Sequence, residues 1–309
     1  LILLDPFLLL FGFGAVLAYL RWRAQVEQYN SRSLLAVAGI LSGMAISIKW
    51  TGASFLGLIG LLELIRLWQT RHTTTRAQIG HFLLSLVIIP TTVYLAVFAL
   101  HFSLLSRSGS GDAFMSARFQ AGLAGSALAT TQYQPMNVLQ KTLELNREMF
   151  KANQRLTTPH PYSSPWYSWP FMDRPIFYWI QGEARIYLLG NPIVWWFSSA
   201  AVLTCLAIAV VSLGRVGLPI AIMLVGWGSN ILPFVSIGRV MFLYHYFTAL
   251  IWAILMLMWL VNRDKKQVHI TLGLALAALV AFMYFAPLSY GTPLAPQAYE
   301  QRVWFGQWR

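Results

Sequence analysis

The chain has 309 residues, of which 57% are hydrophobic and 10% are charged, and its formal net charge is +12. Soluble domains carry about 25% charged residues, so this composition excludes an ordinary soluble protein. Apolar runs of about 20 residues recur, which is enough to cross about 30 Å of hydrocarbon. The runs are continuous rather than alternating, which favours helices over a membrane β-barrel. The sequence therefore predicts an all-α integral membrane protein built as a polytopic helical bundle.

The positive charge does not indicate a nucleic-acid partner, because Lys and Arg lie mainly between the apolar runs rather than in one soluble patch. Cys205 is the only cysteine, lies in an apolar run, and is predicted to be a small packing residue. The sequence opens at Leu1 within an apolar stretch and has no basic leader of the kind that begins a signal peptide. We expect from this opening that the chain lacks an N-terminal part.

Eight spans are predicted in chain order, and the second and third form a short hairpin. They cover residues 5–20, 34–48, 51–67, 79–101, 192–213, 216–235, 240–261 and 268–287. Residues 1–101 thus hold the first four spans, 102–191 a long loop, 192–288 the last four spans, and 289–309 a polar tail.

Basic residues cluster in the turns after the first, third, fifth and seventh spans. They are Arg21, Arg23 and Arg32, then Arg66, Arg71 and Arg76, then Arg215, and finally Arg263, Lys265 and Lys266. Lys and Arg accumulate on the cytoplasmic side of membrane proteins. The pattern therefore predicts that the long loop and the tail are extracytoplasmic.

One part of the long loop, residues 136–156, has an amphipathic helical pattern. Apolar side chains fall on one face and basic ones elsewhere: Leu139, Leu143 and Phe150 against Lys141, Arg147 and Lys151. This pattern is typical of a helix that lies in the membrane interface. A helix packed on a small core of the loop itself fits equally well, and the sequence leaves both interpretations open.

The densest signal in the loop runs from His160 to Pro170, with four aromatic residues and three prolines. Proline fixes the backbone and removes hydrogen-bond donors, so we expect a rigid, non-helical segment. Aromatic rings with polar tips suit stacking on sugar rings. They equally suit an aromatic belt that holds the loop at the bilayer surface, and both interpretations remain open.

Three charged residues are predicted on the same side of the membrane as this segment. Asp5 opens the first span, Lys49 lies at the tip of the short hairpin, and Arg239 begins the seventh span. Charges at membrane depth are costly and are functional candidates, although Lys49 and Arg239 could simply snorkel from helix ends. His245, about two turns into the seventh span, suits either an interhelical hydrogen bond or the site.

A carboxylate, two cations and a rigid aromatic loop at one membrane face suit the transfer of a sugar from a lipid phosphate. A carboxylate takes the proton of an acceptor hydroxyl, and cations stabilise the departing phosphate. We find no His, Cys and carboxylate cluster with metal-ligand spacing, so no metal or other cofactor is predicted.

Five stretches of the sequence resemble the protein O-mannosyltransferase family of membrane-embedded glycosyltransferases. They are Leu3-Leu4-Asp5-Pro6, Ser47-Ile48-Lys49-Trp50-Thr51-Gly52, His160 to Pro170 with Arg174-Pro175, Gly190-Asn191-Pro192 with Trp195-Trp196, and Arg239 to Tyr246. The resemblance implies a polyprenyl-phosphate-mannose donor, Ser or Thr hydroxyls of exported proteins as acceptors, and inversion at the anomeric carbon.

The same resemblance assigns expected roles to individual residues. Asp5 is expected at the catalytic centre, and Lys49, Arg239 and His245 are expected at the donor phosphate. The expected substrate loop and its supports are His160, Tyr162, Ser163, Trp166, Trp169, Arg174 and Asn191.

The family has about eleven spans, so roughly three are expected to be missing here. Its principal catalytic carboxylate belongs to an Asp-Glu pair in the first outer loop, and no such pair occurs in this sequence. Asp5 matches the family's second acidic position, so the chain alone is expected to be inactive. The loop is too short for the β-trefoil insert of eukaryotic members, which points to a multi-pass enzyme of the bacterial cytoplasmic membrane.

Two alternatives remain at this stage. A related transferase could use another sugar or a lipid acceptor. A transporter is the alternative from another class, although the spans show no matching pair of helices broken by Gly or Pro.

Overall fold

The computed structural model describes residues 4–25, 32–129, 133–213 and 215–309. The expectations that involve Leu1 and Leu3, and the side chain of Arg32, therefore lie outside the described part. The chain divides into two compact units, residues 1–156 and 157–309. The long loop predicted at 102–191 is shared between these two units, which are described one at a time.

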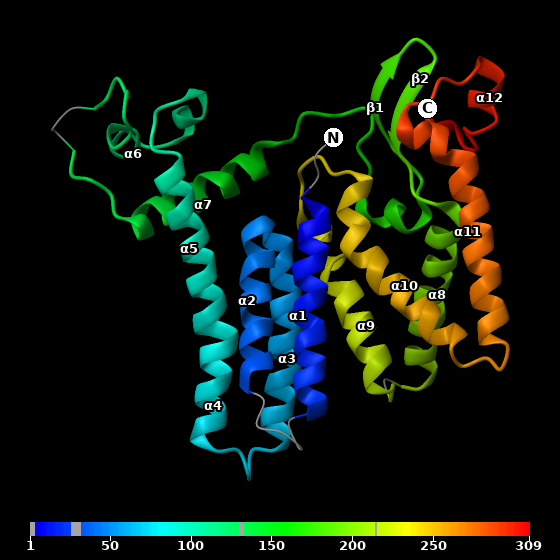
Figure 1. Cartoon of the computed structure of the whole chain (residues 1–309), viewed down its shortest axis with the longest axis horizontal. Helices are drawn as coiled ribbons and strands as arrows, with labels where there is room; N and C mark the ends of the chain where they lie inside the picture. Colours follow the sequence, from blue (N-terminus) through cyan, green and yellow to red (C-terminus); the bar gives the residue numbers. More distant parts are fainter. Residues whose placement is uncertain (1–3, 26–31, 130–132, 214) are drawn as a thin grey trace. The chain divides into compact units, whose positions relative to one another are not determined.

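The first unit consists of helices joined by turns and, between α6 and α7, by a longer loop (Figure 1). In chain order they are α1 (Asp5–Gln25), α2 (Arg32–Ile48), the 3-10 turn η1 (Trp50–Gly52), α3 (Ala53–Gln69), α4 (Arg76–Leu83), the π-helical turn η2 (Leu84–Ile88), α5 (Ile89–Leu104), the 3-10 turn η3 (Ser110–Phe114), α6 (Ala117–Ala121) and α7 (Val138–Arg155). Helix α1 packs on α2 and α3, and α2 packs on α5.

Close helix packing explains two glycines in α2. A Cβ atom at Gly39 would lie 1.9 Å from the carbonyl oxygen of Ser85, and one at Gly43 would lie 2.8 Å from that of Pro90. Small residues four positions apart let helix backbones approach closely in a membrane. The π-helical turn η2 ends two residues before Pro90, whose ring removes a donor from the helix, so this turn accommodates the proline.

Helix α7 confirms the helix predicted at 136–156. Asn137 caps its N-terminus, where the side chain accepts from the backbone N–H of Gln140 at 2.8 Å. One side of α7 contacts a small apolar cluster of the loop through Leu145. Leu143 on another side is 63% exposed. The helix therefore has a small core on one side and an unpacked apolar strip on the other.

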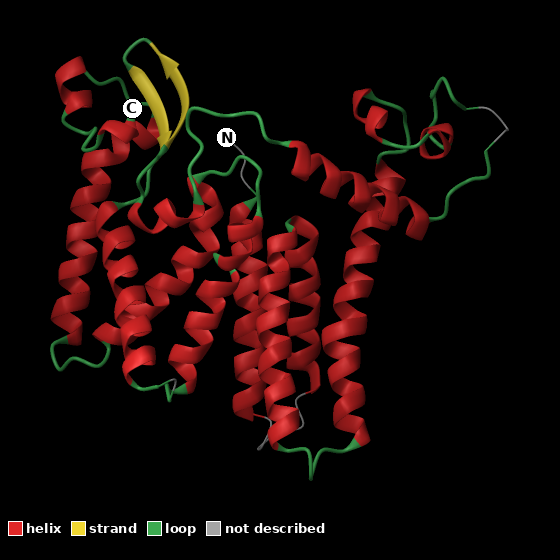
Figure 2. Ribbon diagram, turned by 180° about the vertical axis from the view of Figure 1, so that it is seen from behind, coloured by secondary structure: helices red, strands yellow, loops and turns green. Residues whose placement is uncertain are grey.

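The second unit combines helices with one antiparallel hairpin (Figure 2). Its elements are η4 (Trp166–Phe171), β1 (Ile176–Gln181), β2 (Ala184–Leu188), α8 (Pro192–Val211), α9 (Leu218–Ser229), η5 (Leu232–Ser236), η6 (Leu243–Tyr246), α10 (Phe247–Val261), α11 (Gln267–Tyr290), α12 (Pro296–Glu300) and η7 (Gly306–Trp308). Helix α8 packs on α10 and α11, and α11 packs on β2.

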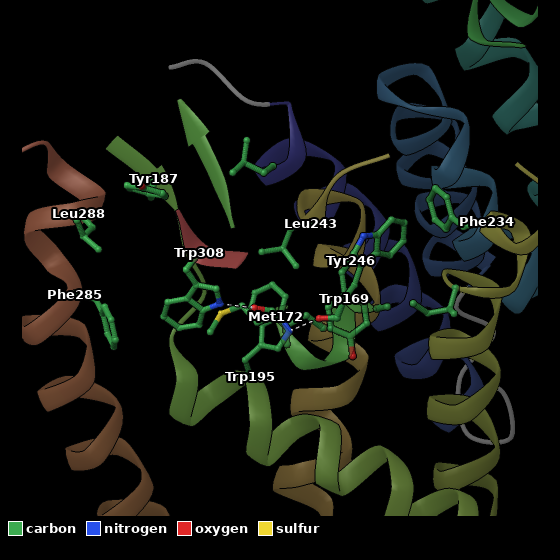
Figure 3. Close-up of a cluster of buried hydrophobic side chains, with 14 residues drawn as sticks. Trp169, Met172, Tyr187, Trp195, Phe234, Leu243, Tyr246, Phe285, Leu288 and Trp308 are labelled. Atoms are coloured by element: carbon green, nitrogen blue, oxygen red, sulfur yellow. Dashed lines mark hydrogen bonds between the residues drawn. The ribbon is translucent and has the colours of Figure 1, made fainter. Parts of the chain in front are cut away.

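An aromatic core holds the second unit together (Figure 3). Trp169, Trp195 and Tyr246 are fully buried in it, and Met172 fills the space between rings. Trp308 is only 3% exposed. The segment 289–309 is therefore not merely the polar tail expected from the sequence, because it delivers an indole ring to this core.

Seven described helices are long and apolar enough to cross a membrane. They cover Asp5–Gln25, Trp50–Gln69, Arg76–Leu104, Pro192–Val211, Leu218–Ser236, Leu243–Val261 and Gln267–Tyr290, and Ser33–Ile48 is a shorter apolar helix. The all-α, polytopic fold class is confirmed. Of the eight spans predicted, the second corresponds to this shorter helix.

Two local predictions were wrong. The segment 160–170 was expected to be non-helical, but Trp166–Phe171 forms a 3-10 helix with Pro170 inside it. The seventh span was expected to begin at Arg239, but Phe242 is extended and the apolar helix begins at Leu243. His245 therefore lies at the start of this span rather than two turns inside it.

Candidate functional site

In the first unit, the ends of two helices bring Asp5 and Lys49 together. Lys49 Nζ lies 2.7 Å from Asp5 Oδ1, and the side chains are 31% and 9% exposed. Asp5 is the first residue of α1, where the positive end of the helix dipole stabilises a carboxylate. Lys49 is extended and separates α2 from η1. The structure thus pairs two of the charged residues singled out from the sequence.

A chain of polar contacts joins the hairpin tip beside Lys49 to two further elements. Trp50 Nε1 donates to the Tyr94 hydroxyl of α5 at 3.2 Å, and that hydroxyl donates to Asn146 Oδ1 of α7 at 2.5 Å. The rings of Trp50 and Phe150 lie 6.5 Å apart. These contacts fix the position of α7 relative to the tip of the hairpin.

In the second unit, the His160 segment forms a tight turn that is joined to the segment before α10. The backbone N–H and the hydroxyl of Ser163 both donate to the carbonyl oxygen of His160, at 3.0 and 2.8 Å. The Ser164 N–H donates to the Met241 carbonyl at 2.9 Å, and the His160 ring meets the edge of Phe242 at 5.0 Å. Two stretches almost 80 residues apart in sequence are thus in contact.

Trp169 and His245 form the centre of this contact. Their rings are stacked, with centroids 5.7 Å apart and an interplanar angle of 10°. Trp169 Nε1 donates to the Ser164 hydroxyl at 3.0 Å. His245 Nδ1 lies 2.9 Å from the carbonyl oxygen of Phe242 and 3.2 Å from the backbone nitrogen of the same residue, and the tautomer decides whether it donates to the first or accepts from the second. The structure brings together these two residues, both predicted from the sequence.

Tyr162 and Trp166 support the turn from its two ends. The Tyr162 ring packs 5.7 Å from that of Phe177 in β1, and Trp166 meets Tyr167 edge to face at 5.7 Å. Both belong to the partly buried rim of the aromatic core. Tyr167 itself is 62% exposed, so one ring of this segment remains open to ligands or lipid.

The two arginines predicted in this unit lie close in sequence to the segments that form this contact. Arg239 Nε donates to the carbonyl oxygen of Val240 at 3.3 Å, three residues before Phe242. Arg174 follows η4 by three residues, is half-buried, and has a buried Nε with no hydrogen-bond partner among the described residues. Arginine is well suited to phosphate because its guanidinium presents a planar fork of donors.

Asn191 caps one helix and hydrogen-bonds to another. Its Oδ1 caps the N-terminus of α8 by accepting from Ile193 and Val194 at 3.1 and 3.3 Å. Its Nδ2 donates to the Ala278 carbonyl of α11 at 2.7 Å. The geometry therefore explains this residue as a joint between two helices.

The β-hairpin formed by β1 and β2 is fastened to the C-terminal segment by a pair of tyrosines. The hydroxyls of Tyr187 and Tyr299 lie 2.7 Å apart. Burial, and then this hydrogen bond, raises the pKa of Tyr187 above its ordinary value. The Tyr187 hydroxyl therefore keeps its proton at physiological pH.

Several contributors were missed by the sequence analysis. Tyr94 and Asn146 lie in an apolar span and in the amphipathic helix, and neither is close in sequence to a recognised stretch. Trp308 was passed over as part of the tail. The β-hairpin of β1 and β2 could have been predicted from the sequence. Ile176–Gln181 is rich in β-branched and aromatic residues, and Gly182, with a φ of 57°, allows a tight turn.

These features define a class of protein: a polytopic helical membrane protein with charged residues at helix ends and a rigid aromatic segment. Two family models match the sequence. One, described as the C-terminal four TMM region of protein-O-mannosyltransferase, matches residues 138–308, and one, described as dolichyl-phosphate-mannose-protein mannosyltransferase, matches residues 1–106. The first covers more than half of the chain, so the chain belongs to the protein O-mannosyltransferase family. The resemblance drawn from its sequence motifs is confirmed.

Curated relatives support this membership. Dolichyl-phosphate-mannose–protein mannosyltransferase 1 of Candida albicans is 32% identical over 203 residues, which cover 57% of this chain and 23% of the relative. Polyprenol-phosphate-mannose–protein mannosyltransferase of Corynebacterium glutamicum is 27% identical over 369 residues, which cover 99% of this chain and 67% of the relative. The chain thus spans about a quarter of the first relative and two thirds of the second.

A solved structure shares the fold. The Saccharomyces cerevisiae protein O-mannosyltransferase Pmt1–Pmt2 complex, bound to the sugar donor, matches with a TM-score of 0.86 and 18% sequence identity. The match covers 99% of this chain and 74% of the matched chain.

Proposed function

We propose that this chain is part of an enzyme that transfers mannose from polyprenyl-phosphate-mannose to Ser or Thr hydroxyls of exported proteins. Family membership supports the reaction class, and the names of the relatives supply the donor. The observation that carries the proposal for this chain is the pairing of Lys49 with Asp5, since both come from the recognised motifs. The proposed location is the bacterial cytoplasmic membrane.

The proposed working face is extracytoplasmic. Asp5 and Lys49 lie at the ends of α1 and α2 opposite to the basic turns that follow α1 and α3. In the second unit, the His160 segment precedes α8, whereas Arg215 follows the other end of α8. Basic turns remain on the cytoplasmic side, which supports this orientation.

The proposed chemistry is a displacement with inversion. The acceptor oxygen forms a bond to the anomeric carbon while the bond from that carbon to the phosphate oxygen breaks, and polyprenyl phosphate leaves. A carboxylate accepts the hydroxyl proton. Lys49 in the first unit and Arg239 in the second are each proposed as phosphate-binding cations, because a cation stabilises the charge that a departing phosphate gains. When Lys49 binds phosphate it releases Asp5 from the ion pair, so the carboxylate becomes available near the reaction.

Asp5 is proposed as a second carboxylate rather than the sole base. The Asp-Glu pair that the family uses does not occur in these 309 residues. His160, Tyr162, Ser163, Trp166 and Trp169 are proposed to form the substrate loop, with His245 stacked beneath it and Arg174 beside it. Asn191 supports that loop by fixing the start of α8.

Variants of the full-length protein test these roles. Asp5→Asn and Arg239→Gln should each lower transfer to a Ser/Thr peptide by about 100-fold, because each removes a group that acts on the reacting atoms. Membranes would be supplied with labelled polyprenyl-phosphate-mannose and the peptide, and initial rates would be measured at equal expression.

Matched controls change the same chemical groups elsewhere. Asp112→Asn alters a half-buried acid in η3, and Arg147→Gln alters an exposed base on α7. Both should retain normal rates. Unchanged rates in the Asp5 and Arg239 variants would overturn the site assignment.

A further inference from the structure

Four consecutive carbonyl groups at the end of η4 each accept a hydrogen bond from a side chain. The donors come from α8 and from the C-terminal segment. Trp195 Nε1 donates to the carbonyl of Trp169 at 2.7 Å, Ser199 Oγ to Pro170 at 2.5 Å, Trp196 Nε1 to Phe171 at 2.9 Å, and Trp308 Nε1 to Met172 at 3.1 Å. We call the side chains of Trp195, Trp196, Ser199 and Trp308 the carbonyl clamp.

The clamp supplies hydrogen-bond donors to carbonyl groups at a helix end. The last carbonyls of a helix have no N–H partner within it and usually turn to water or to capping groups. Here Ser199, Trp196 and Trp308 take that role for the carbonyls of residues 170–172, and Trp195 adds a second donor to the Trp169 carbonyl, which also accepts from the Met172 N–H. Trp195 and Trp308 are themselves buried. Figure 3 shows the bonds from Trp308 to Met172 and from Trp195 to Trp169 as dashed lines.

The clamp also contacts Met172, a residue with an unusual backbone conformation at which the chain changes direction. Met172 adopts the left-handed conformation, with φ 55° and ψ 40°. A residue other than glycine rarely adopts this conformation, which persists only when the surroundings hold it. Trp308 contacts the carbonyl of this residue from 136 positions further along the chain. The chain then turns through Asp173 and Arg174 into β1.

We propose that the carbonyl clamp, with Trp308 as its distant member, positions residues 166–174 so that Arg174 is held in one place. The clamp donors are positioning residues, because they act on the backbone of this segment and not on substrate. The effect on transfer rests on the proposed function, whereas the effect on the segment itself does not.

The test compares Trp308→Phe with Trp304→Phe in the full-length protein. Trp304 stacks on Trp308 with centroids 6.0 Å apart, but it donates to none of the four carbonyls. Hydrogen exchange of the amides of Met172 and Asp173, followed by mass spectrometry, should be about fivefold faster in Trp308→Phe than in wild type, and unchanged in Trp304→Phe.

Transfer kinetics give the second measurement. Trp308→Phe should raise the KM for polyprenyl-phosphate-mannose about fivefold with kcat within twofold, because apparent affinity scales with the fraction of protein whose segment is in place. Trp304→Phe should keep the KM of wild type.

A second, more conservative pair of variants keeps the test decisive if Trp308→Phe does not fold. Ser199→Ala removes one clamp donor, whereas Ser198→Ala removes a neighbouring buried hydroxyl with no hydrogen-bond partner among the described residues. Faster exchange at residues 166–174 only in Ser199→Ala supports the clamp.

Equal exchange within each pair overturns the clamp. Absence of transfer in wild type would instead overturn the proposed function, and the exchange data would still decide whether the segment is clamped.

Discussion

Gly39 shows how one residue sets the distance between two spans. A side chain there would collide with the backbone of Ser85, so the contact between α2 and η2 depends on the missing Cβ. By contrast, nothing lies within 4 Å of the corresponding position at Gly57 in α3. The two glycines therefore differ in what surrounds them, although both lie within apolar helices.

Substituting alanine at each position should separate the two cases. Gly39→Ala should destabilise the protein by about 1–3 kcal/mol, because the added methyl forces the backbones apart. Gly57→Ala should be neutral or slightly stabilising, since alanine suits a helix better than glycine. Thermal unfolding in detergent measures both, and equal melting temperatures for the two variants would contradict this explanation of the packing.

At the same scale, the sequence indicated the charged candidate residues but not the aromatic residues that make the key contacts. Asp5 and Lys49 stand out because charges are rare in this chain and both lie at helix ends. Trp308 does not stand out, because it is one of 13 tryptophans and its partner Met172 is far away in the sequence. Only the folded chain shows which of many aromatic residues donates to which carbonyl.

At the scale of elements, α7 raises the question of where a helix meets the membrane surface. Tyr94, which bonds to Asn146 of α7, lies 18 residues after Arg76, or about 27 Å along a helix. This length approaches the thickness of the hydrocarbon layer, about 30 Å. With Arg76 at the cytoplasmic surface, α7 would lie at the opposite surface with its exposed apolar strip available to lipid.

Nitroxide labels on two sides of α7 test this placement. Leu143 and Ala152 are both exposed and, at 100° per residue, point in opposite directions from the helix. A label at Leu143→Cys should be more accessible to oxygen than to a water-soluble nickel complex, and a label at Ala152→Cys should show the reverse. Labels that are equally accessible to the nickel complex would favour the alternative of a helix packed only on the core of its loop.

Elements differed in how well they could be predicted. Apolar runs predicted the spans because burial in lipid requires continuous hydrophobic helices. The start of the seventh span was misplaced, since Val240 and Met241 are apolar yet lie in irregular chain before the helix. The hairpin was missed because its aromatic residues were interpreted as part of the loop, although β1 and β2 flank a short turn at Gly182.

At the scale of the whole molecule, the alternation of basic turns runs through both compact units. In each unit the residues proposed for the reaction lie at the helix ends away from these turns. This pattern depends on the membrane rather than on contacts within the protein, so composition and charge were sufficient to predict it. The aromatic core of the second unit required tertiary contacts between distant segments, which the sequence alone does not specify.

The most direct test of the central claim is to follow the mannose label itself. Membranes that contain the full-length protein would receive labelled polyprenyl-phosphate-mannose and an exported Ser/Thr peptide, and the products would be separated into peptide and lipid fractions. We predict label on the peptide, attached through a Ser or Thr oxygen with inverted configuration. Label only in new lipid products would identify a transferase with a lipid acceptor, and label that remains on the donor would contradict the proposed transferase activity.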